Sequence, residues 1–110
     1  MLSFEEFLKI DVRVGEIVSA EHFERAKKPA YILKIDFGEK IGIRKSSAQI
    51  TENYSVDDLP GKQILAVVNF PNKQIGPIMS EVLVLGVPDE YGNVVLIGPE
   101  REVPLNVRIY

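Results

Sequence analysis

Apolar residues recur through most of this sequence with the two-residue period of a β-strand. The segment Ile10–Phe23 places Val12, Val14 and Val18 on one face, and Ala30–Phe37 repeats the pattern with Tyr31, Leu33, Ile35 and Phe37. Successive side chains of a strand point to opposite faces, so this alternation predicts strands with one face in a core. Gly15 lies inside the first of them and indicates a bulge or sharp bend, which lets a strand curl around a small barrel.

The stretch Gln63–Leu85 has a different pattern. It contains two continuous apolar runs, Ile64–Val68 and Val82–Leu85, which predict strands buried on both faces. The connector between the runs is long and unusually apolar. Two interpretations are open: the connector folds back on its own core, or it forms a binding surface. For the second, the candidate polypeptide-binding residues are Phe70, Pro71, Ile75, Ile78 and Met79.

Four shorter segments complete the predicted element order. Ser3 and Glu6 form a capping-box pattern that opens a short N-terminal helix. Ile41 and Ile43 extend the inward face of a third strand, Lys40–Lys45, and a helical segment is expected over Ser46–Tyr54 with a second cap at Ser55. Short strands are expected at Val94–Ile97 and around Val107 and Ile109.

A short helix, three strands, a helical segment, two strands and short final strands give the order of a particular all-β fold. We predict a five-stranded OB-fold Greek-key barrel with short helices, an N-terminal helix and a C-terminal extension, as a single domain over residues 1–110. The length suits one domain with one core. Ligand binding by such barrels is a fold-level association only.

The composition excludes several kinds of chemistry. With no cysteine and one histidine, His22, the chain cannot build a typical zinc site, and it contains neither a nucleophile elbow nor a phosphate-binding loop. We therefore expect no enzyme activity, no metal and no cofactor. The sequence has no apolar run of membrane-spanning length, and its N-terminus lacks the basic region of a signal peptide, so we expect a cytoplasmic protein without membrane insertion.

Positive charge is concentrated in one part of a chain whose formal net charge is −3. Seven basic residues and only two acids lie between Arg25 and Lys45. The segment is either a solvated strand face or a phosphate-binding patch. If the segment binds phosphate, polar residues near the ends of the predicted strands would contribute to the site together with the basic residues. The candidate tRNA-binding residues are Arg25, Lys27, Lys28, Arg44, Lys45, Ser46, Ser47, Asn69, Lys73 and Ser80, although Ser46 could equally cap the expected helix.

Several motifs, in unbroken order along nearly the whole chain, resemble the tRNA-binding domain family. They are Lys9–Gly15, Lys28–Tyr31, Ile35–Gly38, Ile41–Thr51, Ala66–Pro71 and Met79–Gly86. The resemblance implies an OB-fold, a homodimer and no catalysis. Within the family, the chain is most similar to the CsaA-like branch of export-related chaperones, whose partners are secretory polypeptides and the export ATPase.

Three places depart from the tRNA-binding branch of that family. This chain has Ser46-Ser47-Ala48 where that branch has a Val-Ser-Gly type of segment. It has Asn69-Phe70-Pro71 in place of Asn-Leu-Lys-Pro, and Glu81-Val82 in place of a Gly-Met pair. A basic residue is lost and an acid is gained beside the expected site. The first hypothesis is therefore a chaperone-like protein that holds unfolded or export-bound polypeptides, and the second is structure-specific tRNA binding by the basic segment.

A two-fold interface is expected from the parts least needed to close a barrel. These parts are the N-terminal helix and the segment Val103–Tyr110, whose apolar residues could pack against a second copy.

Overall fold

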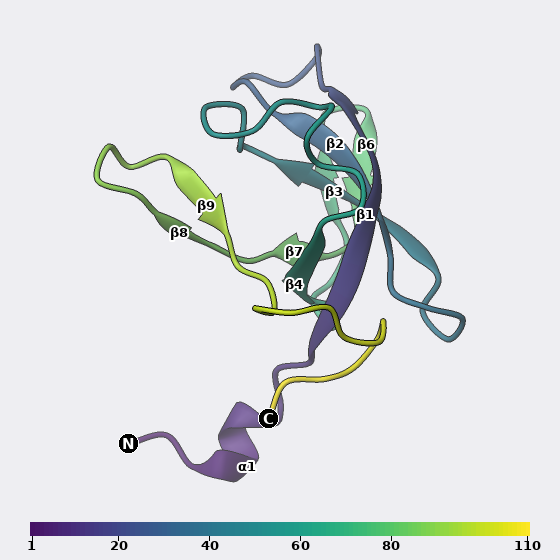
Figure 1. The fold of residues 1–110 in the computed structure, drawn as a ribbon, viewed down its shortest axis with the longest axis vertical. Helices are drawn as coiled ribbons and strands as arrows, with labels where there is room; N and C mark the ends of the chain where they lie inside the picture. Colours follow the sequence, from purple (N-terminus) through teal and green to yellow (C-terminus); the bar gives the residue numbers. More distant parts are fainter.

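Nearly all regular structure in the chain is β-sheet. The computed structural model describes residues 1–110 (Figure 1). Its elements are α1 (Phe4–Phe7), β1 (Val12–His22), β2 (Tyr31–Asp36), β3 (Ile43–Ala48), β4 (Gln63–Val67), β5 (Lys73–Ile75), β6 (Ile78–Ser80), β7 (Leu83–Val84), β8 (Gly86–Pro88) and β9 (Val94–Leu96). Five strands form one antiparallel sheet in the order β3-β2-β1-β4-β7, while β5–β6 and β8–β9 are separate hairpins.

The sheet curls until its two edges nearly meet. The amide of Glu81, just before β7, donates to the carbonyl of Lys45 in β3 at 2.8 Å. The Lys45 amide donates to the Glu81 carboxylate at 2.9 Å, and the Ser47 amide donates to the Ser80 hydroxyl at 3.2 Å. These bonds close most of the gap between β3 and the segment that leads from β6 into β7, so the predicted five-stranded OB-like barrel is confirmed.

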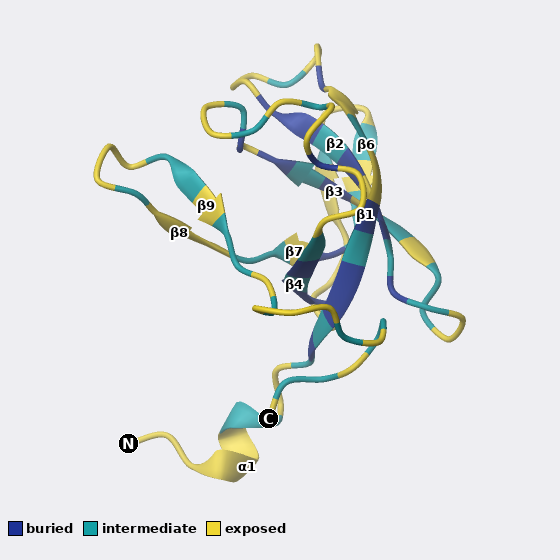
Figure 2. Cartoon of the chain, in the orientation of Figure 1, coloured by how far each residue is buried: buried dark blue, intermediate teal, exposed yellow.

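The barrel interior is filled by side chains from its strands and from one turn (Figure 2). The largest apolar residues without solvent exposure are Ile17, Leu33, Ile35, Phe37, Leu59 and Ile64. Burial of one such side chain stabilises the fold by about 1.5–3 kcal/mol, so this cluster dominates the energetics. The strands predicted over Ile10–Phe23 and Ala30–Phe37 are confirmed.

The bulge lies at a different residue from the one that the sequence indicates. The β1–β2 register shifts between Ile17 and Ser19, so the extra residue is Val18. Ile17 lies in the core on the same face as Gly15, ahead of the shift, and Val18 is exposed, so the predicted faces of these two residues are reversed. Gly15 serves close packing instead, because a Cβ there would lie 2.7 Å from the Phe37 ring.

The helix predicted over Ser46–Tyr54 is absent. Strand β3 continues through Ala48, with Ser46 opposite Leu33 and Ser47 opposite Ile32 in β2. Both serines lie within this strand, so neither caps a helix. Ser55 forms only a turn, in which its hydroxyl donates to the Asp58 carboxylate at 2.8 Å.

Two apolar side chains predicted to face the core are exposed. Ile43, at the start of β3, is 55% exposed, and Leu83 in β7 is 48% exposed. Strand β7 has only two residues and pairs on one side with β4, so one of its faces meets solvent. The run Val82–Leu85 is therefore not buried on both faces.

The two chain ends lie outside the barrel on the same side (Figure 1). The capping box of α1 is confirmed, with the Ser3 hydroxyl accepting from the Glu6 amide at 3.1 Å. The C-terminal segment runs beside β1, where the Val14 amide donates to the Val107 carbonyl at 3.0 Å. No helix of the structure is both long and apolar enough to cross a membrane.

Candidate nucleic-acid interface

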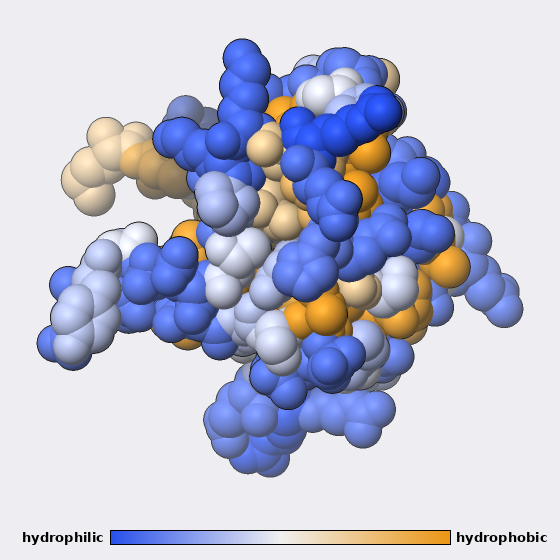
Figure 3. Space-filling model, turned by 90° about the horizontal axis from the view of Figure 1, so that it is seen from above, coloured by the Kyte–Doolittle hydropathy of each residue, from blue (hydrophilic) through white to orange (hydrophobic).

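One depression in the surface gathers most of the basic residues identified from the sequence. It has a volume of about 540 Å³ and lies between the β1–β2 loop and the β5–β6 hairpin. Four of its lining residues are basic, and we call the depression the basic groove: Arg25, Lys27, Lys28 and Lys73. Figure 3 views the end of the molecule that carries the loop, where hydrophilic side chains surround small, separate apolar patches.

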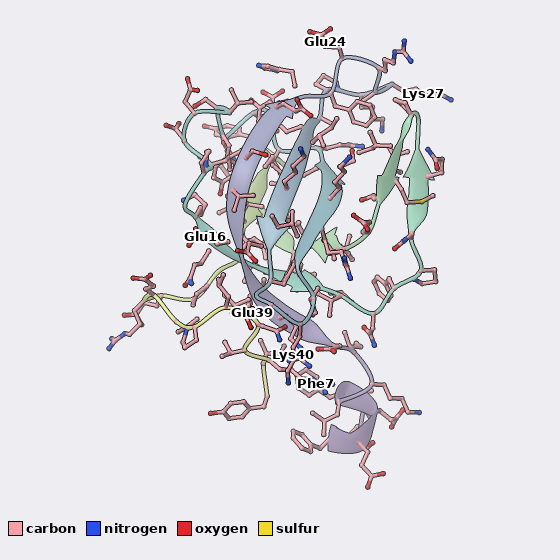
Figure 4. All side chains as sticks on the ribbon, turned by 90° about the vertical axis from the view of Figure 1, so that its right-hand side faces the viewer. Phe7, Glu16, Glu24, Lys27, Glu39 and Lys40 are labelled. Atoms are coloured by element: carbon pink, nitrogen blue, oxygen red, sulfur yellow. The ribbon has the colours of Figure 1, made fainter.

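The groove is held open by contacts between the loop and the hairpin tip. Gly76, in the hairpin turn, has φ +54° and lies close to the Phe23 ring and the Arg25 carbonyl. The Gln74 side-chain amide donates to the Gly76 carbonyl at 2.7 Å and braces the turn. In Figure 4, the tip of the hairpin reaches the loop near Lys27. The two walls of the groove therefore support each other.

The charge of the groove is of one sign. No acidic residue contributes to its lining, although the whole chain carries more acids than bases. Uncharged donors and acceptors complete the surface, from the side chains of Ser47, Gln49 and Gln74. A concave surface with several cations and no anion attracts phosphate groups and can hydrogen-bond a nucleic-acid backbone without reading its sequence.

The structure separates the other predicted tRNA-binding residues. Lys45 is exposed on the outer face of β3, two residues from Ser47, whereas Arg44 belongs to the opposite face of that strand. Ser46 is only 2% exposed, so its side chain lies in the barrel wall and does not reach a ligand. Asn69 has a structural role, because it accepts from the Asp11 amide and donates to the Lys9 carbonyl.

The predicted polypeptide-binding residues do not share one surface. Phe70 and Pro71 line a small cavity of about 140 Å³ together with Lys73, Ser80, Glu81, Val82 and Leu83. In the β5–β6 hairpin, Ile75 lies opposite Ile78, and Gln74 lies opposite Met79. Side chains on adjacent positions point to opposite faces, so Met79 is directed away from both isoleucines.

Some residues of these surfaces carry no clear signal in the sequence. The small residues Ala26, Ala30 and Gly76 are part of the lining of the basic groove. Ile43 and Leu83 expose apolar surface on the two strands at the edges of the sheet. The turn pair Gly76-Pro77 is the one local signal for a hairpin tip. The positions of the others depend on how the sheet closes.

The OB-like barrel and its basic groove, which lies between a loop and a hairpin, are the features of small binding domains of the OB type. A family model described as "putative tRNA binding domain" matches residues 12–108. The chain therefore belongs to the tRNA-binding domain family, as the resemblance in its motifs indicated.

Solved structures of similar chains agree in fold over the full length. The chaperone CsaA of Bacillus anthracis is 50% identical with a TM-score of 0.92, and the match covers 100% of this chain and 99% of that chain. The CsaA chaperone protein of Picrophilus torridus is 51% identical with a TM-score of 0.91, and the match covers both chains completely.

Sequence relatives include much longer proteins. The methionine–tRNA ligase of Thermococcus onnurineus is 35% identical over 108 residues, which are 98% of this chain and 14% of that protein. The chain thus spans only a small part of the length of such relatives and corresponds to one domain of them.

Proposed function

We propose that this protein is a non-catalytic binding protein whose basic groove holds the phosphate backbone of tRNA. The observation that carries this proposal is the convergence of Arg25, Lys27, Lys28 and Lys73 on one concave surface without an acidic neighbour in its lining. Membership of the tRNA-binding domain family supports the choice of nucleic acid. Residues 1–110 would act as one functional domain in the cytoplasm.

The test is the salt dependence of tRNA binding. Lys27→Ala with Lys28→Ala removes two cations from the groove, and we expect at least a tenfold weaker affinity, equivalent to ~1.4 kcal/mol. The slope of log affinity against log salt should fall by about one for each phosphate that the variant no longer neutralises. The control is Lys9→Ala with Lys40→Ala, which has the same charge change. Both control lysines lie outside the groove lining, and Figure 4 shows Lys40 far from Lys27.

Two results would contradict tRNA binding. One is an affinity that does not respond to salt. The other is an equal loss of affinity in the groove variant and the control variant, because that would indicate a general charge effect.

A second candidate function is the holding of unfolded or export-bound polypeptides, with the export ATPase as a further partner. Two observations favour it. Phe70 is 50% exposed beside the exposed Leu83 in a small, partly apolar cavity, and Met79 adds a flexible apolar side chain nearby in the chain. The two similar structures with chaperone names share half of their residues with this chain.

Suppression of aggregation of a denatured protein tests the second candidate. We expect Phe70→Ser with Met79→Ser to lower the suppression, whereas Val87→Ser with Val95→Ser in the β8–β9 hairpin should not. Both pairs remove exposed apolar surface. Unchanged suppression in a folded Phe70 and Met79 double variant would rule out a role for these two side chains in holding polypeptides.

We also propose that the protein is a homodimer whose interface includes α1 and the C-terminal segment. A helix of four residues is unstable in isolation, yet α1 lies outside the barrel with Phe4 64% exposed. Leu2, Ile10, Val107 and Tyr110 are further exposed apolar residues near the chain ends. A second copy packed on these side chains would stabilise α1 and bury them.

A further inference from the structure

A second cavity adjoins the basic groove on the other side of the β1–β2 loop. It is an open depression with a volume of about 510 Å³. It is lined by His22, Phe23, Glu24, Ala26, Pro29, Ala30, Tyr31 and Thr51, and we call it the aromatic cavity. Ala26 and Ala30 also line the basic groove, so the two depressions share a wall.

A third, smaller depression joins the two at a second point. It has a volume of about 330 Å³, takes Lys28 and Gln49 from the basic groove, and takes Pro29 and Thr51 from the aromatic cavity. The three together form a surface track around the loop that carries Glu24 and Lys27, which both project from the same end of the molecule in Figure 4. The three depressions are therefore neighbours on the surface around this loop.

The aromatic cavity offers an exposed ring that packs against a buried one. The His22 ring packs edge-on against the Tyr31 ring, with centroids 5.3 Å apart and planes at 80°. The Tyr31 hydroxyl donates to the Tyr54 carbonyl at 2.7 Å, which holds that ring, and His22 itself is exposed to solvent. An exposed imidazole in a lining that also includes Pro29 suits a flat aromatic ligand.

The basic groove is positively charged and the aromatic cavity is not, which matches the difference between the phosphate and the base of a nucleotide. The basic groove carries four cations, whereas the aromatic cavity contains no lysine or arginine and includes the Glu24 carboxylate. A carboxylate repels a phosphate but accepts hydrogen bonds from the amino groups of a base. The track therefore fits a nucleotide chain with its phosphates in the groove and a base in the aromatic cavity.

We propose that the aromatic cavity receives an unpaired nucleobase of the RNA whose phosphates lie in the basic groove. This inference rests on the proposed binding of tRNA and adds that a single-stranded part of the RNA is recognised. The base must be unpaired because paired bases in an A-form duplex keep their faces stacked and inaccessible. Stacking of one base on an aromatic side chain contributes about 1–3 kcal/mol, without strong sequence preference.

The experiment uses the full chain and two RNA probes. One is a blunt-ended RNA hairpin, and the other is the same hairpin with a short single-stranded overhang that carries a fluorescent adenine analogue. We expect the overhang to strengthen binding about tenfold, which corresponds to ~1.4 kcal/mol, and the analogue to be quenched when it stacks.

Substitutions at His22 locate the effect. His22→Ala should abolish the preference for the overhang and the quenching, with the affinity for the blunt hairpin unchanged. His22→Phe should retain both, because stacking needs a ring and not its nitrogens. Ser19→Ala is the matched control, since Ser19 is exposed on the same strand and lies outside the cavity lining.

Failure of this inference is distinguishable from failure of the proposed function. If the overhang adds no affinity and His22→Ala changes neither probe, while Lys27→Ala with Lys28→Ala still weakens both, the aromatic cavity does not take a base but tRNA binding stands. If neither probe nor tRNA binds, both proposals are wrong. If a peptide rich in aromatic residues reverses the quenching and unlabelled overhang RNA does not, the cavity takes polypeptide side chains and the inference is overturned.

Discussion

Single residues in this protein are constrained by contacts that come from distant parts of the chain. Gly15 is a clear case. A Cβ atom at this position would lie 2.6 Å from Ile35 Cγ2 and 2.7 Å from the Phe37 ring. Both neighbours are fully buried and cannot move aside easily. The absence of a side chain at Gly15 lets β1 pass close over β2.

We expect Gly15→Ala to lower the free energy of unfolding by about 1–3 kcal/mol, the usual cost of overpacking a core. Urea unfolding of the variant and of Ser19→Ala measures the effect. Ser19 is exposed on the same strand, so its variant should match the wild type. Equal stability of all three proteins would show that the core relaxes around the added methyl group.

Asp89 ties the β8–β9 hairpin to the turn before β4. Its carboxylate accepts from the Asn53 side chain at 3.0 Å and from the Asn93 and Tyr91 amides at 2.9 Å each. These donors, the Asn53 amide most strongly, hold the pKa of Asp89 below its usual range. The ionised form therefore stabilises the folded state.

The lowered pKa determines the direction of a pH effect. A carboxyl group whose pKa is depressed by folding stabilises the protein above its unfolded pKa, and this contribution is lost as pH falls through the folded pKa. We expect Asp89→Asn to reduce the melting temperature at neutral pH, with a difference from the wild type that shrinks below about pH 4. Asp57→Asn, at an exposed turn, serves as the control. A difference that stays the same from neutral to strongly acidic pH would contradict this origin.

At the scale of elements, a side chain of the C-terminal segment joins Asn69 in attaching the N-terminal segment to the barrel. The Arg108 guanidinium donates to the carbonyls of Leu8 and Ile10, and its Nε lies 3.6 Å from the Asp11 carboxylate. Arg108 also sits in a bridge with Arg13 of β1. Arg108 thereby joins the two ends of the chain, about a hundred residues apart in sequence, next to β1.

Removal of this side chain should loosen the segment that leads from α1 into β1. We expect Arg108→Ala to speed amide hydrogen exchange over residues 8–11, with a loss of roughly 1 kcal/mol in local stability, because partly exposed ionic hydrogen bonds contribute at about that level. Arg101→Ala is the control, since Arg101 is highly exposed and pairs only with its neighbour Glu100. Unchanged exchange in the Arg108 variant would show that backbone pairing and the Asn69 side chain hold the segment without Arg108.

At the scale of the whole molecule, the exposed apolar residues at the chain ends bear on its oligomeric state. We expect light scattering at micromolar concentration to give twice the chain mass of 12.3 kDa. Phe4→Asp should yield a monomer, because a carboxylate cannot be buried there without a partner. Tyr91→Asp at the tip of the β8–β9 hairpin should leave the dimer intact. A wild-type mass equal to that of one chain would refute the dimer.

A dimer would also affect RNA binding. Two basic grooves on one particle can engage the same tRNA, and the second contact is then intramolecular, which raises the overall affinity. Phe4→Asp should therefore weaken tRNA binding more than its distance from the groove would explain. The Tyr91→Asp variant provides the comparison.

The sequence by itself determined the type of barrel. Alternation in the first two strands, the apolar run Ile64–Val68 and the capping box at Ser3 are local patterns, and local backbone geometry produces them directly. The basic segment and the apolar connector could also be identified in the sequence, because each is defined by its local amino-acid composition. Five of the predicted tRNA-binding residues do converge on the groove: Arg25, Lys27, Lys28, Ser47 and Lys73.

Tertiary structure decided everything that depends on sheet closure and register. Ser46 looked like a ligand contact or a helix cap, but pairing of β3 with β2 turned it into the barrel wall. One extra residue at Val18 packs Ala20, and not Ser19, against the core after Ile17, since a shift of one position moves side chains to the other side of a sheet. The basic groove arises only when the β5–β6 hairpin meets the β1–β2 loop, and no local pattern encodes a meeting of segments about fifty residues apart.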